Sequence, residues 1–187
     1  ADILDAAGYE IIFMETVGVG QSELDIAGAA DTTIVVLVPE SGDGIQAMKA
    51  GLMEIADFFV MNKSDRPGAD QAVMSIKMIL GFRSPSASGW IPDVLKTIGN
   101  EGKGIEGVVQ MIANHRAALE KTGELLERRT ARLEGRIREL IEDRLRVDFW
   151  SEERTKALRR ELINVVRREQ TPYDLVEKLI ADFKKGA

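Results

Sequence analysis

A four-residue segment with the chemistry of a base-reading loop follows a short apolar run, residues 58–61. It reads Asn-Lys-Ser-Asp at residues 62–65. The carboxylate of Asp65 can accept two parallel hydrogen bonds from the adjacent N1–H and N2–H₂ groups of guanine, a pair that adenine lacks. Asn62 either hydrogen-bonds the base or ties neighbouring loops together, and the aliphatic stem of Lys63 can cover a purine face. The alternative is a polar turn capped by Asp65.

A second candidate loop, residues 15–23, reads Glu-Thr-Val-Gly-Val-Gly-Gln-Ser-Glu and follows an earlier apolar run. A carboxylate at a strand end, such as Glu15, can reach Mg²⁺ through water, because Mg²⁺ keeps part of its hydration shell. Gly18 has no Cβ, so its backbone N–H can approach a terminal phosphate closely. Taken alone, this pattern is weak, and a glycine-rich turn between strand and helix would look the same.

Two further loops complete the candidate site. Residues 39–44 lead into a helix that carries a lone cation, Lys49. This segment is either a mobile switch whose lysine enters the site or a loop followed by a solvated side chain. Residues 99–104 follow another apolar run, and the backbone N–H of Gly99 is a candidate donor to guanine O6.

The elements that must position these loops alternate along the first part of the chain. Continuous apolar runs predict strands at residues 11–14, 32–38, 58–61 and 93–98. Helical stretches lie at residues 22–29, 45–56 and 69–80. Strand–helix–strand repetition with continuous apolar runs predicts a mainly parallel, Rossmann-like α/β sheet, whose ligands bind at the carboxyl ends of the strands.

The remaining chain predicts helices alone, over residues 104–121 and 124–147, then one opened by Ser151 and one from Pro172 to Gly186. The helix at 124–147 carries an apolar stripe that needs a covering surface, so it is either a helical subdomain or an arm that buries the stripe against a second copy. His115 is expected to be a polar helix residue. Four methionines at helical spacing are expected in the core: Met48, Met53, Met74 and Met78.

Composition removes several classes of function. The 187 residues contain no Cys, which excludes disulfides, cysteine nucleophiles and thiolate zinc sites. The net charge is −9 over residues 1–115 and +3 over residues 116–187, and the acidic part disfavours nucleic acid. No run has the roughly 18 apolar residues of a membrane span, and no signal peptide is visible, so we expect a cytoplasmic protein without a membrane partner.

These segments, in this order, resemble the MeaB/ArgK group of P-loop GTPases. The motifs that carry the resemblance are E-T-V-G-V-G-Q-S-E, G-D-G-I-Q-A-M-K-A-G, N-K-S-D and H-R-A-A-L-E-K-T-G-E-L-L-E-R-R. The resemblance implies the carboxyl-terminal part of a G-domain over residues 1–121 and a helical dimerisation arm over residues 122–187. It also implies GTP or GDP with Mg²⁺ as cofactors, and a GTPase chaperone that serves an adenosylcobalamin-dependent mutase of the methylmalonyl-CoA type.

The family's site residues carry over position by position. The resemblance gives Glu15 the Walker B and Mg²⁺ role and Lys49 that of the switch III lysine. It assigns to catalysis Glu15, Gly18, Gln21 and Lys49, and to the base Asn62, Lys63, Asp65, Ile98 and Gly99. Because the last two stand where the family has a Ser-Ala-like pair, we expect only the backbone contact to persist there.

One family motif is absent. No G-x-x-x-x-G-K-[ST] occurs in the 187 residues, although that loop supplies the phosphate cradle, a lysine and a Mg²⁺ hydroxyl. We therefore expect a partial P-loop GTPase that opens in the helix before the Walker B strand, needs a P-loop segment or companion chain, and does not hydrolyse GTP alone. Two alternatives are a helical dimerisation module with a vestigial nucleotide site and an ATPase or kinase linked to lysine/arginine/ornithine transport. Asp65 favours guanine and therefore speaks against the ATP-dependent alternative.

Overall fold

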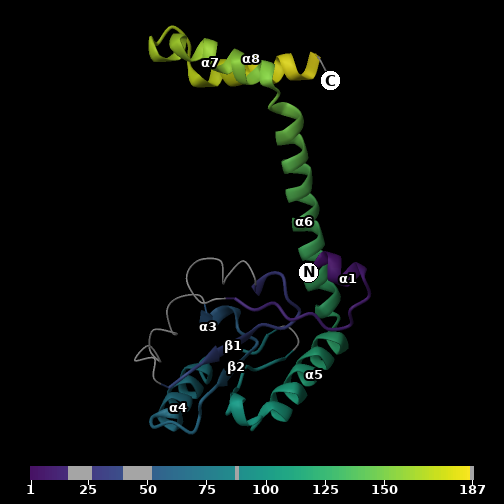
Figure 1. The fold of residues 1–187 in the computed structure, drawn as a ribbon, viewed down its shortest axis with the longest axis vertical. Helices are drawn as coiled ribbons and strands as arrows, with labels where there is room; N and C mark the ends of the chain where they lie inside the picture. The colour runs from purple at the N-terminus through teal and green to yellow at the C-terminus, as the bar shows by residue number, and fades with distance from the viewer. Residues whose placement is uncertain (17–26, 40–51, 87–88, 186–187) are drawn as a thin grey trace. The chain divides into compact units, whose positions relative to one another are not determined.

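The computed structural model describes residues 1–16, 27–39, 52–86 and 89–185. These residues form two compact units, Ala1–Arg132 and Leu133–Ala187, and the boundary between them falls inside one long helix. Figure 1 labels most of the helices and strands of the two units. The first unit contains the strands, and the second is helical.

The sheet of the first unit has three strands in its described part, β1 (Ile34–Leu37), β2 (Phe58–Met61) and β3 (Val94–Lys96), in the order β1-β2-β3. Both pairings are parallel. The α/β class with a parallel sheet is therefore confirmed. Three predicted strands form, one of them with the predicted bounds and two with trimmed ends.

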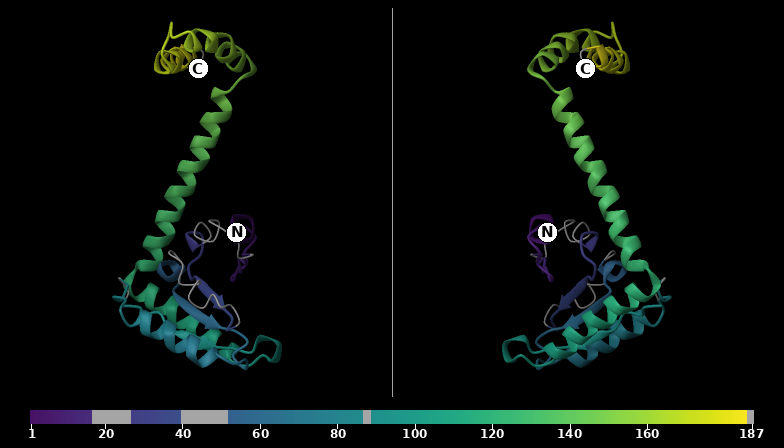
Figure 2. Two further views of the ribbon diagram at one scale, coloured as in Figure 1. Left: turned by 90° about the vertical axis from the view of Figure 1, so that its left-hand side faces the viewer. Right: turned by 90° about the vertical axis from the view of Figure 1, so that its right-hand side faces the viewer.

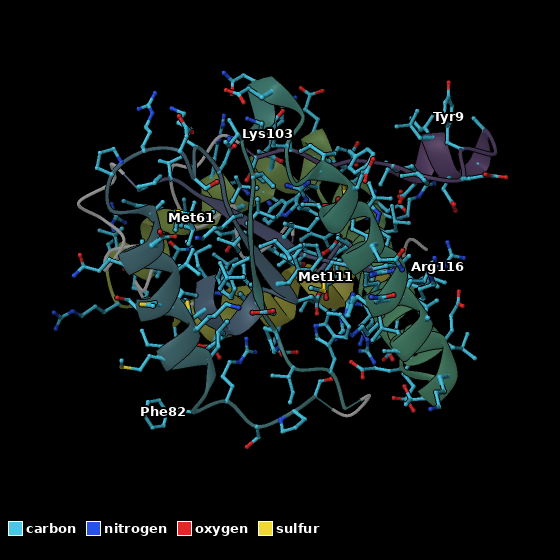
Figure 3. All side chains as sticks on the ribbon, turned by 90° about the horizontal axis from the view of Figure 1, so that it is seen from below. Tyr9, Met61, Phe82, Lys103, Met111 and Arg116 are labelled. Atoms are coloured by element: carbon cyan, nitrogen blue, oxygen red, sulfur yellow. The ribbon has the colours of Figure 1, made fainter. Side chains whose placement is uncertain are left out.

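Helix α4 (Ala69–Leu80) covers one face of this sheet, and its bounds match the prediction. Its residues Val73, Ile76 and Leu80 pack in one buried cluster with Phe59 and Met61 of β2. Because side chains alternate along a strand, the other two residues of β2 point to the opposite face, and they are also buried. Figures 1 and 3 show α5 (Ile105–Thr122) across the strands from α4.

The predicted strand at residues 11–14 does not form. Residues 11–16 have no regular structure, and Ile11 and Phe13 are 69% and 82% exposed. A strand is stable only where a neighbour takes its backbone hydrogen bonds, and no segment in the described part of the chain pairs with these residues. Apolar composition alone was therefore an insufficient reason to expect a strand.

Short helices complete the first unit. They are α1 (Asp2–Ala6), α3 (Leu52–Ile55) and the 3₁₀ turn η2 (Gly99–Glu101). The rest of the predicted helix at 45–56, and most of that at 22–29, lies outside the described residues. Helix α6 (Glu124–Phe149) begins in this unit, directly after Gly123.

The methionine prediction is right at one position and wrong at two. Met53 packs against the buried cluster of α4 and the sheet. Met74 and Met78 are instead 71% and 69% exposed, because the inward face of α4 is taken by the residues that flank them in the helical period. Met48 lies outside the described residues. Helical spacing identified a stripe without showing which way it faces.

The second unit comprises the remainder of α6 with α7 (Glu152–Val166) and α8 (Pro172–Lys185), which lie side by side in Figures 1 and 2. The Ser151 hydroxyl accepts the Arg154 N–H at 3.2 Å, so the predicted helix cap is confirmed. The Arg154 guanidinium lies 4.7 Å from the ring centre of Phe183 and donates to the carbonyl of Phe149. These contacts fasten the α6–α7 corner.

The apolar stripe of α6 is not covered within the second unit. Its five members are each more than half exposed: Leu133, Ile137, Leu140, Ile141 and Leu145. None of the helices in the described ranges is long and apolar enough to cross a membrane.

Candidate functional site

The segment after β2 lies against the segment after β3. The N–H of Ser64 donates to the carbonyl of Thr97 at 3.0 Å, and the N–H of Thr97 donates to that of Met61 at 2.9 Å. Figure 3 labels Met61, the last residue of β2, and Lys103, which ends the loop after β3. The structure therefore brings together the two loops that the sequence assigned to the purine.

Asn62 joins these loops through its side chain. Its Oδ1 accepts the Gly99 N–H at 3.0 Å and the Thr97 hydroxyl at 3.2 Å. Because a backbone N–H can only donate, this contact fixes the oxygen toward the β3 loop and leaves Nδ2 as the outward donor. Nδ2 makes no hydrogen bond to a described residue. Of the two roles expected for Asn62, the loop tie is present, and the donor for a base remains available.

Lys63 and Asp65 lie on the exposed side of the same loop. Lys63 has φ of 54°, and its carbonyl accepts the N–H of Arg66 at 3.1 Å, so the loop turns sharply after Asn62. The Asp65 carboxylate has no hydrogen bond or ion pair with the described residues. Its charge helps to raise the pKa of Lys103, although the larger cause is the hydrogen bond of that ammonium to Glu101. Within the described ranges, the Asp65 carboxylate is thus an acceptor without a hydrogen-bond donor of its own.

Backbone hydrogen bonds join the two ends of the loop after β3. Ile98 and Lys103 exchange both N–H···O=C hydrogen bonds, at 3.0 and 3.3 Å, so the backbone of Ile98 is engaged within the loop. Gly104 follows with φ of 79°, and a Cβ there would overlap the carbonyl oxygen of Lys96. Only glycine fits this position, where the chain turns from the loop into α5.

The expected donor to guanine O6, the N–H of Gly99, is the group bound by Asn62. A base at this site would have to share that N–H with Asn62 or use another donor of the loop. This role of Gly99 stays a prediction.

The phosphate side of the predicted site is largely outside the described residues. Gly18, Gln21 and Lys49 lie there, so their roles stay predictions. Glu15 is described and exposed, and no contact joins it to the loop at residues 62–65 within the described chain. No cluster of three potential metal ligands occurs among the described residues.

A polar cluster that the sequence did not predict lies at the other end of the strands. It consists of Thr32, Asp57, Trp90, His115 and Arg128, named here the Asp57 cluster. His115 was expected to be an ordinary polar helix residue, but it is fully buried. The one available signal was an acid placed directly before an apolar strand.

Its neighbours explain how a carboxylate is tolerated there: Thr33 N–H and Arg128 donate hydrogen bonds to Asp57, and His115 lies 3.3 Å from it. Burial works to raise the pKa of Asp57, but the contact with His115 and the hydrogen bond from the N–H of Thr33 outweigh it, so the pKa lies below its usual range. A cavity of about 460 Å³ adjoins the cluster and is lined in part by Asp57, Arg83, Trp90 and Arg128. Because its lining precedes the parallel strands, this cavity lies at the opposite end of the sheet from Asn62.

Comparison with known proteins decides the family. The family model described as "Methylmalonyl Co-A mutase-associated GTPase MeaB" matches residues 1–154. The chain belongs to the MeaB family. It is 45% identical over 141 residues to a Pyrococcus horikoshii protein named as a GTPase, covering 74% of this chain and 44% of that protein.

Two other similarities extend over nearly the whole chain. The Caenorhabditis elegans protein named "Methylmalonic aciduria type A homolog, mitochondrial" is 28% identical over 185 residues, which cover 97% of this chain and 46% of that protein. The crystal structure of a protein named "LAO/AO transport system kinase" matches with a TM-score of 0.68 at 28% identity, covering 97% of this chain and 60% of that one. The P-loop GTPase fold is thereby confirmed, and the chain spans about half the length of the curated relatives it matches.

Proposed function

We propose that this chain supplies the base-binding part of a guanine-nucleotide site in a GTP-hydrolysing protein. The observation that carries the proposal is the pairing of the loop at residues 62–65 with the loop after β3. The outward Nδ2 of Asn62 is a donor for N7 of a purine, and the unpaired carboxylate of Asp65 can accept the two N–H donors of guanine. The stem of Lys63 can cover the base.

The phosphates require groups from elsewhere. We assign Mg²⁺ contact to Glu15, a phosphate amide to Gly18, and catalytic support to Gln21 and Lys49, on the resemblance alone. Several backbone amides and a lysine in fixed geometry hold the β- and γ-phosphates in P-loop proteins. Because the 187 residues contain no such loop, we assign the cradle to a separate segment or a companion chain, and we expect no GTP hydrolysis by this chain alone.

The client and the assembly are also part of the proposal. We propose that the GTPase serves as a chaperone of an adenosylcobalamin-dependent mutase of the methylmalonyl-CoA type, in the cytoplasm. The description of the matching family model and the name of the Caenorhabditis elegans relative support this assignment. The uncovered stripe of α6 supports an arm, residues 122–187, that pairs with a second copy.

The base assignment can be tested on the 187-residue chain by NMR. Guanosine diphosphate at millimolar concentration should shift the amides of residues 62–65 and 97–103, and adenosine diphosphate should not. Asp65→Asn should abolish the guanine response and gain a response to xanthosine diphosphate, since xanthine carries an oxygen where guanine has N2. Equal responses to the two natural nucleotides would refute the assignment.

A second candidate is an ATPase or kinase, which the name of the structurally similar transport system kinase favours. The same titration separates the two candidates, because an adenine site requires a response to adenosine diphosphate that survives Asp65→Asn.

A further inference from the structure

The first turns of α6 are attached to the first unit with little apolar burial. Of residues 124–132, Glu124 is buried, Leu125 is half-buried and Leu126 is 72% exposed. A helix held to a domain usually buries an apolar stripe. One half-buried leucine is a small apolar contact, so polar contacts must contribute to holding this segment.

Arginines make the attachment. Arg128 Nη1 lies 3.2 Å from Asp57 Oδ1 and its other nitrogens bind Glu124 in the same helix. Arg129 and Arg132 both bind Asp31, and Arg132 also donates to the carbonyl of Ala30 at 2.5 Å. The segment is thus fastened at two acidic points, of which Asp57 is the more buried, at 12% side-chain exposure against 35% for Asp31.

Asp57 also contacts the segments that lead into β1 and β3. Its Oδ2 accepts the N–H of Thr33 at 2.7 Å, just before β1, and its carbonyl accepts Trp90 Nε1–H at 2.7 Å, before β3. Its own N–H donates to the carbonyl of Thr33 at 2.9 Å. The residue itself directly precedes β2. The side chain and backbone of Asp57 therefore connect the segments that precede β1, β2 and β3 with α6.

His115 completes the cluster from α5. Its Nδ1 lies 2.8 Å from the Thr32 hydroxyl, and its ring packs on Trp90 with 4.8 Å between ring centres. Nε2 lies 3.3 Å from Asp57 Oδ1, a close buried contact outside hydrogen-bond geometry. The fully buried imidazole of His115 packs against the same carboxylate that binds Arg128. This arrangement indicates that the position of Asp57 is closely controlled.

We propose that Asp57 is a positioning residue that fastens the first turns of α6 to the amino-terminal ends of the strands, with Arg128 as its contact on α6 and His115 as its support. The core between β2 and α4 is packed from apolar side chains and contains none of the five residues of the Asp57 cluster, so we expect its packing to persist when this attachment is weakened. The inference concerns α6 and is independent of the proposed nucleotide function.

The test is hydrogen exchange on the 187-residue chain carrying Arg128→Gln. Amides of residues 124–132 should lose protection about tenfold or more, while those of β2 and α4 change less than about twofold. The matched control is Arg138→Gln, an arginine of the same helix whose ion pair among the described residues is with Glu134, four residues earlier. It should leave residues 124–132 unchanged.

A spectroscopic readout separates positioning from general support of the fold. In a Trp150→Phe background, Trp90 is the sole tryptophan and reports the cluster directly. Arg128→Gln should red-shift its emission, and Arg138→Gln should not.

Asp57→Asn is the second variant. Thr33 N–H binds Oδ2 of Asp57 and Arg128 binds Oδ1, so an amide, which puts an NH₂ group in place of one of these oxygens, loses one of the two contacts together with the charge. The same local loss of protection is expected. Unchanged protection of residues 124–132 in both variants, or an equal loss in β2 and α4, would overturn the proposal.

Discussion

Replacing Asn62 separates its structural role from its proposed contact with a base. In Asn62→Ala, the N–H of Gly99 and the hydroxyl of Thr97 both lose their acceptor. Each hydrogen bond contributes about 0.5–1.5 kcal/mol net, so the loss should be about 1–3 kcal/mol in the free energy of unfolding. Urea denaturation, with an unchanged slope and a lower midpoint, measures it.

Asn62→Asp is the matched variant. A carboxylate keeps an acceptor for Gly99 and Thr97, so the free energy of unfolding should stay within about 1 kcal/mol of the parent. The outward Nδ2 donor becomes an oxygen that repels N7 of a purine, so the NMR response to guanosine diphosphate should disappear. If the two variants lose equal stability, the stabilising role of the Asn62 hydrogen bonds to Gly99 and Thr97 is wrong. If Asn62→Asp still binds guanosine diphosphate, the proposed contact of Asn62 with the base is wrong.

Three further perturbations test separate parts of the account. Gly104→Ala places a Cβ at a positive φ against a backbone carbonyl, so it should cost more than about 1–2 kcal/mol, and an unchanged urea midpoint would contradict this interpretation. The hydrogen bonds and charges of Arg129 and, next, Arg132 lower the pKa of Asp31 to about 2 against the opposing effect of burial. The stability from these contacts is therefore full above about pH 4 and lost as the pH falls toward 2, by about 1 kcal/mol or less after solvent screening, and Asp31→Asn should remove that part of the acid dependence in urea titrations. Light scattering of the 20.6 kDa chain should give about twice its mass, and Leu140→Glu with Ile141→Glu should give monomer; a stable monomer of the unmutated chain would exclude the arm contact.

Strong local signals predicted much of this fold. The run at residues 58–61 and the helix at 69–80 form with the predicted bounds, because each combines a clear apolar pattern with turn residues at both ends. The Ser151 cap forms because its hydroxyl meets an N–H only three residues away. Such features depend on residues that are close in sequence, so the sequence alone is enough to predict them.

Features that depend on distant partners were not predictable in the same way. Residues 11–14 have a strand composition, but no described strand pairs with them. His115 is buried because Thr32, 83 positions earlier in the chain, meets its ring. The Asn62 tie likewise spans 37 residues to Gly99. Residue types of the candidate site were evident from the chain, whereas only the fold shows which of their atoms are already engaged.

The most direct test of the central claim is calorimetry of the purified 187-residue chain with guanosine diphosphate and Mg²⁺. A base-binding part without a phosphate cradle should bind at the millimolar level, about −4 kcal/mol, and Asp65→Asn should remove that binding. A micromolar dissociation constant would contradict the account, because it would require a phosphate-binding site within these 187 residues.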